Sequence, residues 1–250
     1  MIEINIHDSP YSWFRLAITL LVSTIGSVGV WAIIIVLPLV QDDLGIDRSA
    51  ASLLYTLTMI GFAAGNLIIG RLVDRFGFFS SLLLAAAFTS IGFLGASYAQ
   101  SVEILTIWQI LLGFGAAIGF GPLMADISHW FQKRRGIAVA VAASGNYLSG
   151  AIWPMVLKGV LVEQGWRDAY FFIAMTVLIT LVPLSLFLLR RVPITAIEIS
   201  ETESHSKSKA LRMSPRSLQL LLAVAGLSCC IAMSMPQVHI VSFCMDLGYG

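Results

Sequence analysis

The chain has 250 residues, of which 12% are charged and 58% belong to the hydrophobic class, and its formal net charge is +1. Roughly a quarter of the residues in a soluble domain are charged, so this chain has too few charges to cover a water-exposed surface. Disorder requires low hydrophobicity and high charge, which excludes it here. Three cysteines are too few for a disulfide scaffold, and a near-neutral chain is not expected to bind nucleic acid. An integral membrane protein remains.

Seven long segments contain no Asp, Glu, Lys or Arg, and each is rich in Leu, Ile, Val, Ala and Phe. A helix needs about 20 apolar residues to cross about 30 Å of hydrocarbon, and backbone groups in lipid must pair within their own segment. We therefore predict seven membrane helices in an all-α fold. The segments are Leu16–Gln41, Ser49–Gly70, Phe76–Val102, Ile104–Ala125, Gly136–Leu157, Ala169–Leu189 and Ser217–Met245.

The connections between these segments are short, with one exception. Residues 190–216 are polar and rich in Ser, Glu and Lys. That composition is typical of a flexible linker. We therefore predict an N-terminal segment over residues 1–15, a block of six helices over 16–189, the linker over 190–216 and a seventh helix within 217–250.

Basic residues are distributed unequally between the two sides of the predicted membrane. Cytoplasmic loops carry an excess of Lys and Arg, so the richer side is predicted to be cytoplasmic. This places the N-terminus and the linker in the cytoplasm and the multi-pass chain in a plasma membrane, and the short loops favour a bacterial inner membrane. The richer side holds Arg15, Arg71, Arg75, Lys133, Arg134, Arg135, Arg190, Arg191, Lys207, Lys209, Arg212 and Arg216, and the other holds Arg48, Lys158 and Arg167.

A weak internal repeat relates the second and fifth predicted helices. Residues 63–70 read AAGNLIIG and residues 143–150 read ASGNYLSG. The second helix runs inward and the fifth outward, so the repeat is inverted, as in many secondary transporters. Chance is the alternative, because Ala and Gly are common in membrane helices. The shared Asn, which needs a partner in lipid, favours a true repeat.

The segment after the second helix reads GRLVDRFG over residues 70–77. Its two glycines permit a tight turn, and Asp74 can cap the next helix. The segment resembles the signature loop of the major facilitator superfamily, in which a Gly, an Asp-Arg pair and a second Gly join helices two and three. Phe78 and Phe79 stand where the family usually has basic residues. The matching residues are Gly70, Asp74, Arg75 and Gly77.

Two further stretches are similar to the monocarboxylate-porter-like branch of that superfamily. They are HWFQKRRGIAVAVAASGNYLSGAIWP, which begins at His129, and MPQVHIVSFCMDLGYG, which ends at Gly250. The resemblance implies a major-facilitator-type bundle of two six-helix halves. The chain would comprise the N-terminal half, with an inverted 3+3 repeat, and the first helix of an incomplete C-terminal half. It would be a fragment or a natural truncation, and it would need the missing half for transport.

The resemblance implies secondary active or facilitative transport of a small organic solute by alternating access, with monocarboxylates as one candidate class. Two positions depart from the pattern. Gln109 stands where many proton-coupled facilitators carry Arg, so coupling through that residue is not supported. Gly29 and Trp31 occur without the acidic residue of animal monocarboxylate porters, which leaves the substrate open.

Two alternatives belong to other functional classes. A truncated half acting as a binding or regulatory subunit would be favoured by co-purification with a partner of five helices. A seven-helix receptor or photoreceptor is opposed by the predicted orientation, and the last segment lacks the Lys that retinal requires. No phosphate-binding loop, enzyme motif or metal-ligand spacing occurs, so we expect no enzyme, no cofactor and no metal site.

Uncharged polar and aromatic residues within the segments are candidates for lining a solute cavity. The resemblance places helices one, two, four, five and seven around that cavity. Each residue alone is more often a helix–helix hydrogen bond or a packing residue. His239, close to Pro236, can also titrate near neutral pH. The candidates are Trp31, Tyr55, Asn66, Gln109, Asn146, Tyr147, Trp153 and His239.

Charged residues are expected only outside the seven segments, so no buried charge is predicted within the membrane. Asp126 and His129, at the cytoplasmic end of the fourth helix, are candidates for a gate, and ordinary interface residues are the alternative. Two glycine pairs spaced four residues apart are predicted to form close helix contacts. These pairs are Gly61 with Gly65 and Gly115 with Gly119.

Overall fold

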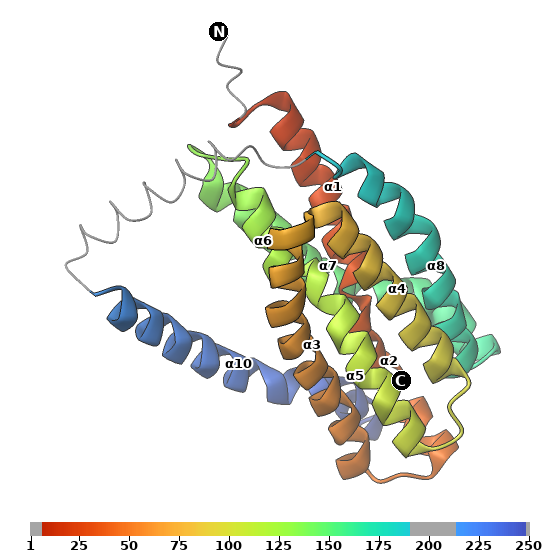
Figure 1. The fold of residues 1–250 in the computed structure, drawn as a ribbon. Helices are drawn as coiled ribbons and strands as arrows, with labels where there is room; N and C mark the ends of the chain where they lie inside the picture. The colour runs from red at the N-terminus through yellow and green to blue at the C-terminus, as the bar shows by residue number, and fades with distance from the viewer. Residues whose placement is uncertain (1–6, 191–213, 249–250) are drawn as a thin grey trace, which may run out of the picture. The chain divides into compact units, whose positions relative to one another are not determined.

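The computed structural model describes residues 7–190 and 214–248, and Figure 1 shows their helices. Within these residues, seven helical segments are long and apolar enough to cross a membrane. The predicted all-α membrane fold is confirmed. The chain forms two compact units, Met1–Arg191 and Val192–Gly250, which are described separately. Most of the predicted linker lies outside the described residues.

Among the described residues, the first unit contains six membrane-length segments, and the second contains one helix. In the first unit, two of the six segments are each built from more than one helix. The elements of the first unit are α1 (Pro10–Gly26), α2 (Val28–Leu44), α3 (Arg48–Phe76), α4 (Phe78–Ser97), α5 (Val102–Ala116), the 3₁₀-helix η1 (Ala117–Gly119), α6 (Gly121–Ser128), α7 (Arg135–Glu163) and α8 (Trp166–Phe187), and the second unit contains α10 (Pro215–Asp246).

The first and fourth spans are interrupted, whereas the sequence predicted a continuous helix for each. The first span changes from α1 to α2 at Ser27. The fourth passes through η1 and then through Phe120, whose φ of −126° and ψ of −90° are not helical. Pro122 at the start of α6 has no N–H to bond to the preceding turn, which favours a new helix start there. The charge-free windows were right about the spans but could not show these breaks.

The two interruptions are in contact with each other. Ser23 Oγ donates a hydrogen bond to the carbonyl oxygen of Gly119 over 2.7 Å. A Cβ atom added to Gly26 would lie 3.9 Å from the Gly119 Cα atom, so the two backbones are close. The buried hydroxyl of Ser27 has no hydrogen-bond partner within the described part of the chain. The first and fourth spans therefore cross where both are irregular.

Glycines allow α3 and α5 to pack at backbone distance. A Cβ atom on Gly61 would overlap the carbonyl group of Ile110, and one on Gly113 would overlap that of Thr58. Small residues in membrane helices permit such close approach. The helix contacts predicted for the glycine pairs are confirmed, and they lie inside the six-helix unit.

The contacts of two glycines support the inverted repeat. One glycine of each copy packs against a neighbouring span. It faces the backbone carbonyl of one residue of that span and the Cβ atom of the residue three positions after it. In the first copy that span is the fourth, and in the second copy it is the first, as an inverted 3+3 repeat requires. The two sets are Gly65 with Phe114 and Ala117, and Gly145 with Leu20 and Ser23.

The signature segment is helical rather than a turn of several residues, which corrects the prediction. Helix α3 continues to Phe76, and Gly77, with φ of 87°, is the single residue between α3 and α4. A residue with a side chain would be strained at that φ. Asp74 lies in the last turn of α3 and does not cap α4, because Gly77 occupies the N-cap position.

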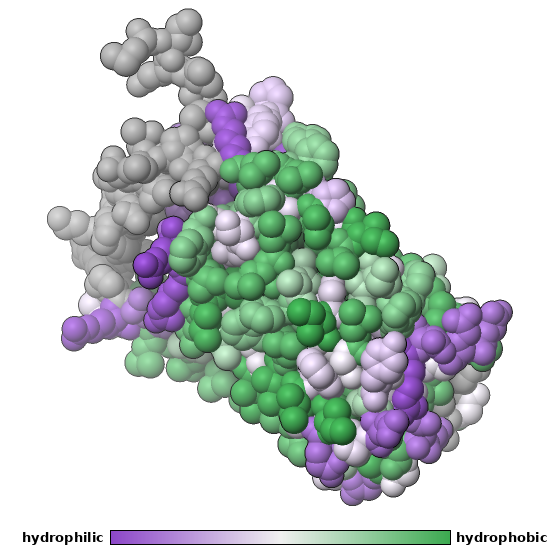
Figure 2. Space-filling view, turned by 45° about the vertical axis from the view of Figure 1, so that its right-hand side comes forward, coloured by the Kyte–Doolittle hydropathy of each residue, from purple (hydrophilic) through white to green (hydrophobic). Residues whose placement is uncertain are grey.

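The outer surface of the helices suits a lipid environment. Large apolar side chains are exposed along several helices, among them Ile107, Ile179 and Leu186. Figure 2 shows apolar side chains covering the middle of one face, with hydrophilic side chains toward its ends. A band of this kind matches the hydrocarbon layer of a bilayer and its two polar borders.

Candidate functional site

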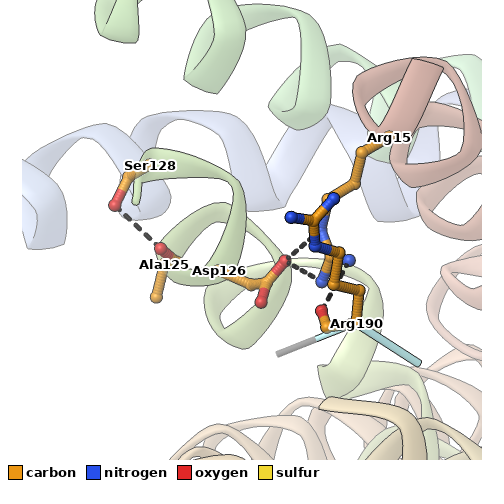
Figure 3. A network of polar contacts seen from close by, with 5 residues as sticks. All are labelled: Arg15, Ala125, Asp126, Ser128 and Arg190. Carbon is orange, nitrogen blue, oxygen red and sulfur yellow. Dashed lines mark hydrogen bonds and ion pairs between the residues drawn. The ribbon is translucent and has the colours of Figure 1, made fainter. Parts of the chain in front are cut away.

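A buried ion pair lies at the end of the bundle that is predicted to be cytoplasmic. Arg15 of α1 donates to Asp126 Oδ2 of α6 from Nη2 over 2.8 Å and from Nε over 3.1 Å. The two side chains are 1% and 10% exposed. Arg15 Nη1 also donates to the backbone carbonyl of Arg190 over 3.1 Å, as Figure 3 shows. The pair therefore joins the first and fourth spans to the end of the sixth.

Aromatic rings complete the surroundings of this ion pair. The Arg15 guanidinium lies 4.6 Å from the ring centre of Trp130, and Trp130 is fully buried. The Arg190 guanidinium lies 5.1 Å from the ring centre of Tyr11. Ring faces attract cations by their quadrupole, so these contacts offset part of the lost hydration.

The buried ion pair corrects the expectation that no charge would be buried in the membrane-spanning helices. The charge-free windows begin after Arg15 and end before Asp126, but α1 and α6 extend beyond them and enclose both side chains. His129 is the C-cap residue of α6. A gate must open and close against another part of the transporter, whereas the Arg15–Asp126 pair joins two helices of one unit. The gate function of Asp126 and His129 stays a prediction.

Trp31 and Asn146 are brought together by the packing of α2 against α7. Trp31 Nε1 donates to Asn146 Oδ1 over 3.3 Å, and both residues are partly exposed. Gly150, one turn further along α7, leaves room for the indole, since a Cβ atom there would lie 2.8 Å from the Trp31 ring. A neighbouring bond runs from Trp153 Nε1, on a buried side chain, to the Thr24 carbonyl over 3.3 Å.

Asn146 and its repeat counterpart Asn66 lie at similar depth. Asn146 comes eleven residues after Arg135, the first residue of α7, and Asn66 comes ten before Phe76, the last of α3. A helix rises 1.5 Å per residue, so each lies about 15 Å from that helix end, near the middle of a hydrocarbon core about 30 Å thick. Asn66 Nδ2 donates to the carbonyl of Phe62 over 2.9 Å.

Gln109 is at the centre of a buried uncharged network. Its Nε2 donates to the Tyr170 hydroxyl over 3.0 Å, and its Oε1 accepts a bond from Thr58 Oγ1 over 3.0 Å. None of these three side chains has exposed surface. The network ties α3, α5 and α8 together. Residues 58, 109 and 170 cannot be associated from the sequence, because no spacing rule relates residues on three separate helices.

The remaining cavity candidates differ in their exposure. Tyr147 is half exposed on α7, whereas Tyr55 is buried on α3. His239 lies on α10, in the second unit, three residues after Pro236. Among the described residues, no group of three or more His, Cys, Asp or Glu is arranged to hold a metal ion.

The opposite end of the bundle carries an exposed ion pair. The Asp43 carboxylate accepts bonds from Arg167 Nη1 and, over 3.3 Å, from Trp166 Nε1. Arg167 Nη2 donates to the carbonyl of Ala99 over 3.1 Å. The Arg167 and Asp43 side chains are 36% and 42% exposed. This pair joins the first span, the sixth span and the connection between the third and fourth.

A family model described as Major Facilitator Superfamily matches residues 19–250. The chain belongs to the major facilitator superfamily. This confirms the resemblance drawn from the signature segment and argues against an enzyme. It also excludes the alternative of a seven-helix receptor or photoreceptor.

Several curated members of the superfamily resemble this chain. Monocarboxylate transporter 4 of Rattus norvegicus is 26% identical over 222 residues, which is 83% of this chain and 45% of that protein. A probable sulfoacetate transporter of Cupriavidus necator is 27% identical over 134 residues, which is 53% of this chain and 31% of that protein. The chain thus spans less than half the length of these relatives.

A solved transporter structure confirms the fold. A bacterial homologue of the human lysosomal transporter Spinster, in an inward-facing and unoccupied conformation, matches with a TM-score of 0.62 at 17% identity. The match covers 74% of this chain and 44% of that one. At this identity it supports the arrangement of helices and no more.

The superfamily signature residues lie on the surface of the first unit. Asp74 and Arg75 are exposed at the end of α3, and the Arg75 guanidinium lies 5.4 Å from the ring centre of Phe76. A Cβ atom on Gly70 would meet nothing within 4 Å. Among the described ion pairs, none includes Asp74 or Arg75. The signature segment thus presents its charges outward from the six-helix unit.

Proposed function

We propose that this chain provides one half of a carrier that moves a small organic solute across a membrane by alternating access. Its membership of the major facilitator superfamily and its six-helix unit with an inverted repeat support this function. Relatives named as transporters are more than twice as long as the region that they share with it. We propose that a second half completes the solute cavity.

The observation that carries the proposal is the Trp31–Asn146 pair. The indole N–H occupies Asn146 Oδ1, which orients the amide so that its NH₂ group can donate to a solute. Both residues are partly exposed, and Asn146 lies near mid-membrane, where solute sites of secondary transporters are found. We propose that Tyr147, which is half exposed on α7, and Asn66, the repeat counterpart of Asn146, belong to the same uncharged wall. We assign it to the polar end of the solute.

We propose monocarboxylates as the solute class. Two relatives are named for the transport of small organic acids, a monocarboxylate and sulfoacetate. An amide N–H bonds well to a carboxylate oxygen, since bonds to ionised acceptors are the stronger kind. We further propose a bacterial inner membrane and a cytoplasmic N-terminus, supported by the asymmetry of the basic residues.

Ligand binding tests the wall without requiring a second half. Titration of the purified chain with L-lactate is expected to change tryptophan fluorescence, and the Trp31→Phe variant is expected to lose that signal. Asn146→Leu should weaken binding about ten-fold, the effect of one hydrogen bond to a charged group. The matched control is Ser144→Ala, an exposed change on the same helix. Equal affinity in the Asn146→Leu variant would contradict the assignment.

Uptake tests the need for a second half. Proteoliposomes that contain only this chain are expected to take up no more labelled lactate than empty vesicles. Uptake above that background, with no second chain present, would contradict the proposal that the chain is half of a carrier.

A further inference from the structure

Basic and aromatic side chains gather at the corner where α1, α7 and α8 meet the predicted cytoplasmic side. Trp13, Phe14 and Phe187 are 37%, 47% and 53% exposed, although they are large and apolar. The Phe14 and Phe187 ring centres lie 6.0 Å apart. We call this the basic–aromatic corner, and its members are Trp13, Phe14, Phe187, Lys133, Arg134 and Arg190.

The two arginines of this corner, Arg134 and Arg190, lie over aromatic rings. The Arg134 guanidinium lies 5.7 Å from the ring centre of Trp13. Lys133, Arg134 and Arg190 are exposed, and neither the Arg15–Asp126 pair nor the Arg167–Asp43 pair includes any of them. The Asp8 carboxylate accepts bonds from backbone N–H groups beside these cations and interacts electrostatically with Arg134. The corner therefore carries positive charge that no described carboxylate pairs with directly.

Asp8 fixes the backbone from which these cations extend. Its Oδ2 accepts bonds from the N–H groups of Gln132 and Lys133 over 3.3 and 2.9 Å, and its Oδ1 accepts one from Arg134 over 3.2 Å. The Asp8 N–H donates to the carbonyl of Trp130 over 3.2 Å. The connection between α6 and α7 is thus held in one conformation before any ligand arrives, which lowers the entropy cost of binding.

At the opposite end of the same unit, the cation Arg167 is paired with a carboxylate. Arg167 bonds to the Asp43 carboxylate and to the Ala99 carbonyl, and its guanidinium lies 4.4 Å from the ring centre of Trp166. Its ring contact resembles that of Arg134, but its charge is already paired. In the basic–aromatic corner the Asp8 carboxylate offsets part of the charge of Arg134, but it bonds to backbone N–H groups, and Lys133 and Arg190 have no carboxylate partner among the described ion pairs.

We propose that the basic–aromatic corner binds the phosphate headgroup of an anionic phospholipid. Cationic residues at the cytoplasmic ends of membrane helices bind such headgroups, and Arg matches phosphate oxygens in geometry as well as charge. The exposed rings of Trp13, Phe14 and Phe187 then lie against the upper acyl chains, where aromatic residues are enriched. This interaction does not depend on the identity of the transported solute.

Lipid retention measured by native mass spectrometry tests the proposal. The purified chain is equilibrated with equimolar phosphatidylglycerol and phosphatidylcholine in detergent, and the bound ratio is counted. The chain should retain phosphatidylglycerol preferentially. Lys133→Gln with Arg134→Gln should lower that preference about 25-fold, since each cation near an anionic surface contributes a factor of about five. The matched control removes two basic residues from the opposite side, with Arg48→Gln and Lys158→Gln, and should keep the preference.

A second measurement covers the case in which the double variant fails to fold. Brominated phosphatidylglycerol should quench the tryptophan fluorescence of the unaltered chain more than brominated phosphatidylcholine, and Trp13→Phe should remove the difference. Equal quenching by the two lipids would overturn the proposal, as would a control variant that loses its preference equally. Release of bound lipid by millimolar inorganic phosphate would assign the corner to a free anion and overturn the lipid assignment.

Discussion

At each end of the six-helix unit the described residues include an Arg–Asp pair, and the two pairs differ in burial. Arg15 and Asp126 are 1% and 10% exposed, whereas Arg167 and Asp43 are 36% and 42% exposed. An exposed pair contributes up to about 1 kcal/mol, because water and salt screen it. A buried pair contributes little net stability, yet loss of one partner costs about 3–5 kcal/mol, because the other charge is then buried without a counter-ion. Location therefore decides which pair the fold depends on.

The largest effect is expected from Asp126→Asn. This change keeps the side-chain shape but leaves the Arg15 guanidinium buried without a counter-ion. The free energy of unfolding in detergent should fall by about 3–5 kcal/mol. Arg15→Met combined with Asp126→Leu replaces both charges with apolar groups and should recover most of that loss. A double variant as unstable as Asp126→Asn would show that the charges themselves are required.

An intermediate effect is expected from the buried network without charge. Tyr170→Phe removes the hydroxyl that accepts the bond from Gln109 Nε2. A buried amide left unsatisfied costs about 1–3 kcal/mol, so thermal unfolding should occur at a lower temperature. The nearby ring Phe93, which packs edge-on against Tyr170, stays in place and controls for packing. If Tyr170→Phe lost as much stability as Asp126→Asn, a buried uncharged network would matter to the fold as much as a buried ion pair.

A small effect is expected from Asp43→Asn at the exposed end. The variant loses the charge that pairs with Arg167 but keeps an oxygen that can accept from Trp166 Nε1. The free energy of unfolding should fall by less than about 1 kcal/mol. In high salt the unaltered chain and the variant should converge, since salt screens exposed pairs. A loss of several kcal/mol that salt does not change would break the comparison of the two ends.

The smallest effect is local and depends on pH. Burial alone would raise the pKa of Asp8, but the backbone N–H bonds from Lys133, Gln132 and Arg134 and the charge of Arg134 bring its pKa below 3.8. A lowered pKa in the folded state means that the fold stabilises the ionised carboxylate. The contribution of Asp8 to stability is therefore complete above pH 3.8 and is lost as the pH falls through the lower pKa of the folded state. Amide hydrogen exchange at residues 132–134 should lose protection over that range. Asp8→Ala should show weak protection at every pH; strong protection in that variant would exclude the carboxylate as its cause.

Much of the fold was predictable because membrane helices are defined by composition. The gaps between charges located all seven segments, and the Asp74–Arg75 pair with its glycines identified the superfamily. Charge gaps also caused the errors. They assigned Arg15 to a flanking segment, because a window that excludes charge cannot detect a helix that buries one.

The candidate site was predictable only as a set of residue types. Trp31 and Asn146 were named as separate wall residues, and their hydrogen bond depends on the packing of two helices that lie far apart in sequence. The interruption at Ser27 was not predictable, because no charge and no proline marks it, and the one at Phe120 is marked only by Pro122, which a charge-free window does not register. Such features arise from tertiary contacts, and the relevant one is the Ser23–Gly119 bond.

The connection between α3 and α4 has a mechanical consequence. Only Gly77 separates the two helices, so the Cα atoms of Phe76 and Phe78 are at most about 7.6 Å apart, two virtual bonds of 3.80 Å. A link this short has no slack. Any force on the end of α3 that carries Asp74 and Arg75 is therefore passed directly to α4, and the two helices are expected to move together.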